Sequence, residues 1–354
     1  MSRRRVQTKE LHAGMVVAQP IISDSGQILL DQGLPLTENL VKKLRELPVA
    51  GVEVVFPDEK YSQKPSFFSS YRETLDMVET TFERVRLFKE VPIAECREIV
   101  DNYIELMINV VDVMDSIFRM KSHNENAFRH SLNVAIIAGI LGKWLGFAGQ
   151  QLKDIILAGL LHDIGKSLIP RRILDKPGSL TNEEMEIVKK HPQQGYRFVL
   201  DCQELSRNVK LGIMQHHERE DGTGYPFGLH SGEIHVAAKI VAIADMYEAM
   251  TTSSVYHEKM SPFAALGVIL EQMYEKLDTK ICYTFITNLS RTMIGNTVLL
   301  SDGKRAKIVL FHDPLSLRPL VQLEHGAMLD LEQNGELTIA AVLEDTKAEG
   351  RANL

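Results

Sequence analysis

Imidazole and carboxylate side chains recur along one long helical stretch of this 354-residue chain, each time next to apolar sequence. The apolar run 155–161 leads directly into His-Asp-Ile-Gly-Lys at 162–166, and a His-His pair at 216–217 follows a second helical segment. Burying such groups costs free energy unless hydrogen bonds or a metal ion replace the lost water. A hydrogen-bonded His–Asp pair, with Lys166 reaching solvent, would satisfy the first motif equally well.

Three further candidates lie on other predicted helices. His130 falls within a helix expected over 127–147, His191 follows a helix expected over 182–190, and Asp245 interrupts the apolar segment 240–250. Each one alone is explained more simply as a hydrogen-bonded polar group in a core. Together with the two histidine motifs they supply mixed imidazole and carboxylate ligands, which suit iron, manganese or zinc. A helix bundle can bring such ligands together in its interior.

The segment after the histidine pair, residues 218–226, has the composition of a shaped loop. It contains two glycines and ends in Gly224, Tyr225 and Pro226. Such a loop can approach a ligand closely and present an aromatic ring to it. An ordinary turn would use the same residue types, so the loop gains weight only from the histidines beside it.

In chain order these residues form the motifs H-D-I-G-K, H-P-x-x-G, H-H-E-R-x-D-G-x-G-Y-P and A-D-x-Y-x-A-M. Over residues 120–275 the order and spacing resemble the HD-GYP family. This family is a branch of the HD phosphohydrolase superfamily whose members hydrolyse the bacterial second messenger cyclic di-GMP. Residues 10–56 and 295–331 resemble segments that often flank such domains, on a much weaker match.

The resemblance implies a role for each matching position. Seven residues match the family's metal ligands: His130, His162, Asp163, His191, His216, His217 and Asp245. Asp163 matches the carboxylate that bridges two ions, and Lys166 matches a lysine that contacts a substrate phosphate, so these two are the expected catalytic residues. The expected cofactors are two divalent transition metal ions, iron or manganese ahead of zinc. The expected substrate contacts are Lys166, Arg219, Gly224, Tyr225, Pro226 and His257.

The sequence departs from the family pattern at two places. Members that hold a third metal use a glutamate four residues before the first histidine, where this chain has Asn126, so two ions are expected. After the A-D-x-Y-x-A-M helix many members carry Arg-Pro-Tyr-Arg, where this chain has Ser-Val-Tyr-His at 254–257. Arginine is not readily exchanged where bidentate phosphate contact is needed, so substrate affinity or choice is in question. Arg219, Lys259 and the pair at 171–172 would compensate, unless they are solvated surface charges.

The resemblance therefore implies a metal-dependent phosphodiesterase that converts cyclic di-GMP to linear pGpG, with further cleavage to GMP left open. One alternative is a sensor that binds a cyclic dinucleotide with weak or no turnover. Another is a hydrolase of a different cyclic dinucleotide. The complete ligand set favours an enzyme, because a pure sensor need not retain every ligand.

The elements that must position these residues are mainly α-helical. Hydrophobic periodicity and capping signals predict helices over 127–147, 152–164, 181–200, 206–217, 233–252 and 261–275. We expect an HD-type all-helical catalytic domain at 122–290, preceded by a small α/β regulatory unit at 1–57 and by a linker with helices at 58–121. A helix is also expected after Thr37, and strands at 15–18, 27–30 and 52–56. A small β appendage is expected at 291–344 and a tail at 345–354.

Composition excludes several other classes. The chain is 44% hydrophobic and 25% charged, which argues against disorder, collagen and disulfide scaffolds. A net charge of −7 provides no basic field for duplex nucleic acid. Its three cysteines have unrelated settings, and neither a membrane span nor a signal peptide is predicted, so we expect a cytoplasmic protein. An apolar stripe over 103–118 suits a core position and also leaves a homodimer open.

Overall fold

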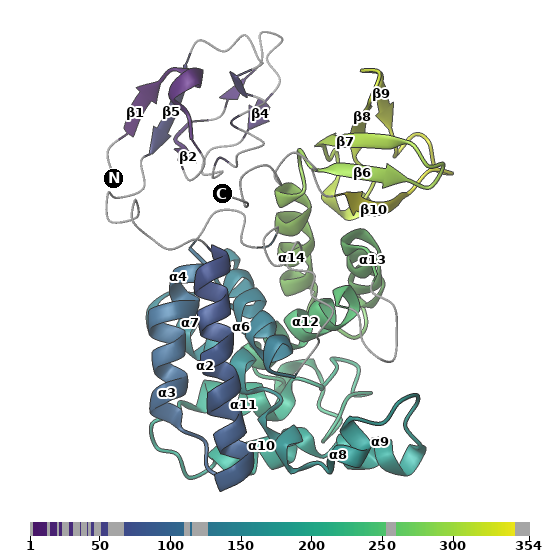
Figure 1. Ribbon diagram of the computed structural model, residues 1–354. Coiled ribbons are helices and arrows are strands. Elements are labelled where there is room, and N and C mark those ends of the chain that lie inside the picture. The colour runs from purple at the N-terminus through teal and green to yellow at the C-terminus, as the bar shows by residue number, and fades with distance from the viewer. Residues whose placement is uncertain are drawn as a thin grey trace.

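The computed structural model describes residues 3–12, 15–19, 21–22, 28–30, 36, 41, 44–45, 51–55, 67–109, 114, 127–252 and 260–343. Figure 1 shows a small N-terminal β unit, a helical body and a C-terminal β unit that follows the last helix. The predicted fold class, mainly α with small β units at either end, is confirmed. Among the described residues, no helix combines the length and the apolar character needed to cross a lipid bilayer.

The N-terminal unit contains a three-stranded antiparallel sheet in the order β1-β5-β2, formed by Arg3–Val6, Val52–Val55 and Val16–Val17. A short helical turn, η1 (Thr8–Glu10), follows β1, and β3 (Ile21–Ile22) pairs with β4 (Ile28–Leu30). Its buried residues form a hydrophobic cluster separate from the main core. Strands thus lie within all three predicted segments, whereas Thr37, the expected helix start, lies outside the described residues.

The helical body begins with α2 (Phe67–Phe88), α3 (Ile93–Ile99), the π-helical turn η3 (Val100–Ile104) and α4 (Glu105–Met107). It continues through α6 (Ala127–Trp144), α7 (Gly149–Leu161), η4 (Ile164–Leu168), α8 (Arg171–Leu174), α9 (Asn182–Val188) and α10 (His191–Val199). The last elements are α11 (Arg207–Gln215), η5 (Ser231–Glu233), α12 (Val236–Thr251), α13 (Pro262–Gln272) and α14 (Thr279–Thr292).

Three of these helices, α6, α7 and α12, pack against one another at the centre of the body. The apolar segments 155–161 of α7 and 240–244 of α12 are fully buried there, as their sequences predict. Met107 and Met114 of the apolar stripe are buried as well, so these two residues belong to the core. The stripe's Val110 and Phe118 lie outside the described residues.

The helix predicted over 181–200 is instead two helices. Thr181 caps α9 by accepting a hydrogen bond from the Glu184 N–H, and Glu184 returns a bond to the Thr181 N–H. Pro192 cannot donate a backbone hydrogen bond to Val188, four residues earlier, and its ring crowds that carbonyl. The chain therefore ends α9 at Val188 and starts α10 at His191.

The C-terminal unit is a five-stranded antiparallel sheet in the order β10-β6-β7-β8-β9. Its strands are β6 (Thr297–Leu300), β7 (Arg305–Leu310), β8 (Leu320–Leu323), β9 (Met328–Asp330) and β10 (Ile339–Leu343), with the turn η6 (Pro314–Ser316) between β7 and β8. Val298, Ile308 and Val321 on its inner face share one hydrophobic core with the helical body. The sheet is thereby held to the helices by apolar packing.

Candidate metal centre and active site

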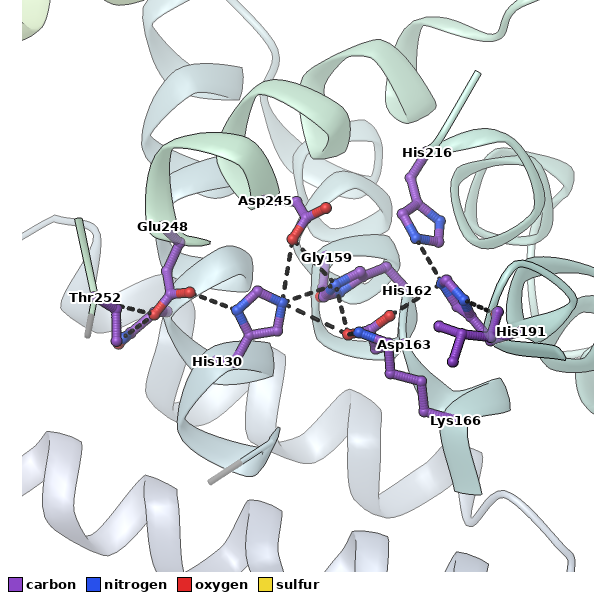
Figure 2. Close-up of polar contacts among 12 residues, drawn as sticks. His130, Gly159, His162, Asp163, Lys166, His191, His216, Asp245, Glu248 and Thr252 are labelled. Atoms are coloured by element: carbon purple, nitrogen blue, oxygen red, sulfur yellow. Dashed lines mark hydrogen bonds and ion pairs between the residues drawn. The ribbon is translucent and has the colours of Figure 1, made fainter. Parts of the chain in front are cut away.

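All seven predicted ligands lie close together where α6, α7, α10, α11 and α12 meet. His130 comes from α6, His162 and Asp163 follow α7, His191 starts α10, the pair His216 and His217 follows α11, and Asp245 lies on α12. Three overlapping groups bring their ligand atoms within 4.8 Å of one another: His130, His162 and Asp245; His162, Asp163 and His216; and His191, His216 and His217. Figure 2 shows most of this cluster and its polar contacts.

Helix ends orient three of the histidines. The last carbonyls of an α-helix lack an intrahelical partner. His162 Nδ1 lies 2.8 Å from the Gly159 carbonyl at the end of α7, and His216 Nδ1 lies 2.9 Å from the Ile213 carbonyl at the end of α11. His191 Nδ1 lies 2.8 Å from the carbonyl of Val188, which Pro192 leaves without its helical partner. Each ring therefore donates its Nδ1–H to the backbone and turns Nε2 inward.

Two acidic residues of helix α12 contact the two ring nitrogens of His130. His130 Nδ1 is hydrogen-bonded to the buried carboxylate of Glu248, and His130 Nε2 lies 3.1 Å from Asp245 Oδ1. The two acids are three residues apart and so share one face of the helix. His130 thus also has its Nδ1 engaged and its Nε2 directed at the cluster (Figure 2).

Asp163 occupies the middle of the cluster, with its two oxygens facing opposite groups. Oδ2 lies 3.5 Å from His130 Nε2 and 3.4 Å from His162 Nε2, and it accepts a 2.6 Å hydrogen bond from Lys166 Nζ. Oδ1 lies 3.1 Å from His191 Nε2 on the other side, and it has no hydrogen-bond partner although it is buried. A carboxylate in this position is suited to bridge two ions.

The donor set fits metal ions. The Nε2 atoms of His130 and His162 are 3.2 Å apart, and so are those of His191 and His216. When Nδ1 carries the proton, Nε2 of a neutral imidazole is an acceptor, so His191 and His216 cannot form a hydrogen bond between their Nε2 atoms. A cation held between such facing lone pairs, together with the unpaired Asp163 Oδ1, would satisfy atoms that are otherwise unmatched.

The two carboxylates of the cluster are held ionised. Burial raises the pKa of Asp163, but His162 and Lys166 outweigh it and place that pKa well below the usual value. Burial likewise raises the pKa of Asp245, and the neighbouring His130 and His162 reverse the shift. Both acids are therefore in the anionic form that metal ligation requires.

The histidines differ in their electrostatics across the cluster. Burial lowers the pKa of His217 to about 3, and burial together with the nearby imidazoles holds the pKa of His216 well below its usual value. At His130 burial also acts to lower the pKa, but Glu248 and Asp245 raise it well above the usual value. The neutral state of His216 and His217 leaves their lone pairs available to a metal ion.

The glycine–tyrosine–proline loop packs against the cluster. The Tyr225 ring stacks on His217 with centroids 4.6 Å apart and an interplanar angle of 29°, and Lys189 Nζ lies 5.9 Å from the Tyr225 centroid. The predicted ring is thus present beside the centre, with contacts to protein groups on its face. The buried Glu218 carboxylate holds the loop by accepting hydrogen bonds from the N–H groups of Phe227, at 2.8 Å, and Leu229, at 3.0 Å.

The other predicted substrate contacts divide into two groups. Gly224 and Pro226 flank Tyr225 in this loop, and Arg219 Nη1 donates to the Glu218 carbonyl at 2.9 Å and to the His216 carbonyl at 3.4 Å. His257 lies outside the described residues. So do Ser254 and Lys259, and also Glu125 and Asn126 at the position of the third-metal glutamate.

Sequence reasoning missed two buried acids beside the site. Glu248 follows Asp245 by one helical turn in an apolar helix, a spacing that signals a second polar residue on the same face. Glu218 directly follows the histidine pair, where it reads as part of a charged loop. Both side chains are only 2–3% exposed, and each organises a neighbour: Glu248 the ring of His130, and Glu218 the loop that carries Tyr225.

Fold and site define a helical domain whose core gathers histidines and aspartates around a common centre. Residues 113–281 match the family model described as HD domain, so this part of the chain is an HD domain. The predicted membership of the HD-GYP branch is confirmed. An HDG"Y"P protein from Bdellovibrio bacteriovorus shares the fold, with a TM-score of 0.53, 16% identity, and 81% of this chain and 99% of that chain covered.

Several curated relatives share sequence with the chain. A cyclic di-GMP phosphodiesterase of Pseudomonas aeruginosa is 32% identical over 250 residues, 71% of this chain and 60% of that protein. The cyclic di-GMP phosphodiesterase response regulator RpfG of Xanthomonas campestris is 37% identical over 147 residues, 41% of this chain and 38% of that protein. A 3'3'-cGAMP-specific phosphodiesterase of Vibrio cholerae is 33% identical over 184 residues, 52% of this chain and 40% of that protein. The chain spans at most three fifths of the length of these relatives.

Proposed function

We propose that this protein is a metal-dependent phosphodiesterase that hydrolyses cyclic di-GMP to linear pGpG. The observation that carries the proposal is the position of Asp163, whose two oxygens face imidazole groups on opposite sides. The Nδ1 atoms of these imidazoles are hydrogen-bonded to backbone carbonyls or to Glu248, so their Nε2 atoms face Asp163. Relatives that are cyclic di-GMP phosphodiesterases support the substrate. Two divalent ions, iron or manganese ahead of zinc, would be held by His130, His162, Asp163 and Asp245 on one side and by Asp163, His191, His216 and His217 on the other.

Each group of residues has a part in this reaction. When bound, divalent ions supply a water molecule of lowered pKa and offset charge on phosphate oxygens. Lys166 places its ammonium 2.6 Å from Asp163 Oδ2, with one third of its side chain exposed, so it can meet a phosphate oxygen at the edge of the centre. There its charge stabilises the negative charge that builds up on that oxygen during attack at phosphorus. Glu218 holds the loop that places the Tyr225 ring beside His217.

A mixed cyclic dinucleotide is a second candidate substrate. The relatives include a 3'3'-cGAMP-specific phosphodiesterase of comparable identity to this chain. The Ser-Val-Tyr-His segment at 254–257 replaces the arginines expected for the dinucleotide, which points in the same direction. The complete set of candidate metal ligands favours an enzyme over a sensor that binds the dinucleotide without hydrolysing it.

The test combines metal content with turnover. The full chain is purified anaerobically, its iron, manganese and zinc are quantified, and cyclic di-GMP and 3'3'-cGAMP are followed separately by chromatography. Asp163→Ala should lose metal and hydrolysis together, while Asp201→Ala, which removes an exposed carboxylate outside the cluster, should retain both. Tight binding of either dinucleotide without turnover by the metal-loaded wild type would refute the enzyme and establish the sensor.

We propose that the division of the chain follows the sequence boundaries at 57, 121, 290 and 344, with the flanking units regulating the centre. A homodimer and a cytoplasmic location belong to the same proposal. The separate hydrophobic cluster of the N-terminal unit supports the first boundary. Limited proteolysis with mass spectrometry tests the boundaries, and light scattering tests the dimer.

A further inference from the structure

A buried chain of hydrogen bonds leads away from the metal centre and reaches helix α2. Beyond His130, the Glu248 carboxylate accepts 3.0 Å hydrogen bonds on Oε1 from Asn133 Nδ2 and Thr252 Oγ1. Asn133 Oδ1 in turn accepts a 2.7 Å hydrogen bond from the Tyr71 hydroxyl. Tyr71, Asn133 and Glu248 are 2%, 7% and 2% exposed, so water does not compete for these bonds.

The Tyr71 hydroxyl fixes the orientation of the Asn133 amide. An asparagine amide has one accepting and one donating end, and rotating it exchanges them. The NH2 group of Asn133 donates to Glu248, which leaves Oδ1 to accept from the Tyr71 hydroxyl, and this second bond holds the amide in that orientation. That contact, with the Thr252 hydroxyl, holds the carboxylate with Oε2 toward His130. A carboxylate behind a ligating histidine fixes the orientation and basicity of the ring.

Helix α2 also contacts the other side of the site. It packs against α6, which carries His130, and against η4, which carries Lys166. Its buried face includes Tyr71, Val78 and Val85. In the chain, α2 is the first described element after the N-terminal strands, from which residues 56–66 separate it. A shift of α2 would therefore act on the hydrogen-bond chain and on η4 together.

We propose that Tyr71, Asn133 and Glu248 are positioning residues for His130, and that α2 sets the metal affinity of the centre through them. This inference rests on the proposed metal centre and adds a route by which the N-terminal part of the chain regulates it. A movement that withdraws Tyr71 from Asn133 frees the amide to rotate and the carboxylate to turn. His130 Nε2 is then less well aimed at the centre.

Metal affinity measured on the full-length chain tests the proposal. Equilibrium dialysis of chelator-treated protein against Mn²⁺ gives a dissociation constant without any need for turnover. Glu248→Gln should weaken binding roughly 10- to 100-fold. Tyr71→Phe, which removes only the hydroxyl, should weaken it by about two- to tenfold, the range for one buried hydrogen bond. Tyr247→Phe is the matched control: this tyrosine is also buried, and its hydroxyl has no hydrogen bond among the described residues. It should bind Mn²⁺ like the wild type.

A double variant separates positioning from general loss of packing. If Tyr71 acts through Glu248, Tyr71→Phe should add little to the loss already caused by Glu248→Gln. Additive losses, equal losses for Tyr71→Phe and Tyr247→Phe, or wild-type affinity in Tyr71→Phe would each overturn the proposal. Hydrolysis is assayed in parallel. If the variants show the expected order of Mn²⁺ affinities but the wild type does not hydrolyse the dinucleotide, the proposed phosphodiesterase is rejected and this inference stands. If the wild type hydrolyses the dinucleotide but the variants do not show that order, this inference is rejected and the phosphodiesterase stands.

Discussion

The glycine of the His-Asp-Ile-Gly-Lys motif allows two elements that carry proposed metal ligands to touch. A Cβ atom built on Gly165 would lie 2.0 Å from the His191 carbonyl oxygen and 2.6 Å from the Gly195 nitrogen. These are backbone atoms and cannot turn aside as a flexible side chain would. The backbones of η4 and α10 therefore approach closely only because residue 165 has no side chain, and the same contact involves the glycine of the His-Pro-x-x-Gly motif.

The displacement that Gly165→Ala demands follows from these distances. Ordinary van der Waals contact begins at 3.4 Å, so the His191 carbonyl must retreat by about 1.4 Å from its present 2.0 Å. His191 carries its Nε2 only 3.1 Å from Asp163 Oδ1, and metal–ligand distances tolerate about 0.2 Å. We expect Mn²⁺ affinity to fall by roughly 10- to 100-fold, the loss that follows when a metal ligand is no longer held in place. Overpacking should also cost roughly 1–3 kcal/mol of unfolding free energy.

Gly267→Ala is the control for this substitution. Gly267 lies within α13, and a Cβ there would meet no atom of the described chain within 4 Å. Alanine in a helix interior is favoured over glycine, so this variant should be more stable by about 0.5–1 kcal/mol with unchanged metal affinity. Urea unfolding and Mn²⁺ dialysis of both variants supply the comparison. Wild-type affinity and stability in Gly165→Ala would refute the close approach of η4 and α10.

Three further outcomes are expected. Glu218→Ala leaves the N–H groups of Phe227 and Leu229 without their acceptor and should cost about 1–3 kcal/mol per group in urea unfolding; unchanged stability would contradict this role. Tyr225→Leu removes the ring stacked on His217 and should weaken Mn²⁺ binding by about two- to tenfold, whereas Tyr225→Phe should not. In the metal-free protein the pKa of His217 is about 3, so the unfolded state takes up this proton first as pH falls below 6.5. His217 alone should then lower the free energy of unfolding by up to about 1.4 kcal/mol per pH unit between pH 6.5 and 3, so His217→Asn should make the fall measured by urea unfolding between pH 6.5 and 5.5 less steep.

The parts of the fold that the sequence predicts well are those governed by local patterns. The apolar runs before His162 and around Asp245 form buried helices because a helix that is hydrophobic on all sides is stable only when it is removed from water. The β6 strand over Thr297–Leu300 follows from its alternation between turn signals. The continuous helix predicted over 181–200 is wrong because Pro192 cannot donate to the Val188 carbonyl, whereas the shorter helix expected over 182–190, before His191, corresponds to α9.

The supporting groups of the site were not predictable in the same way. Tyr71 and Asn133 are separated by 62 positions, and Asn133 and Glu248 by 115, so no local spacing brings them together. Tyr225 was expected to offer its ring to a ligand, and its stacking on His217 depends on how the loop folds back. Such contacts depend on tertiary packing, which the local patterns of a single sequence do not specify.

Local backbone chemistry explains why the histidines point inward. His162 and His216 each end a helix and donate to a carbonyl three residues earlier, which has no helical partner left. At His191 a proline produces the same free carbonyl in place of a natural helix end. His130 lies inside a helix, where no such carbonyl is free, and its Nδ1 is engaged by Glu248. The one histidine of these four without a backbone anchor is therefore the one whose geometry depends on a distant helix, which makes it the natural point for control of the centre.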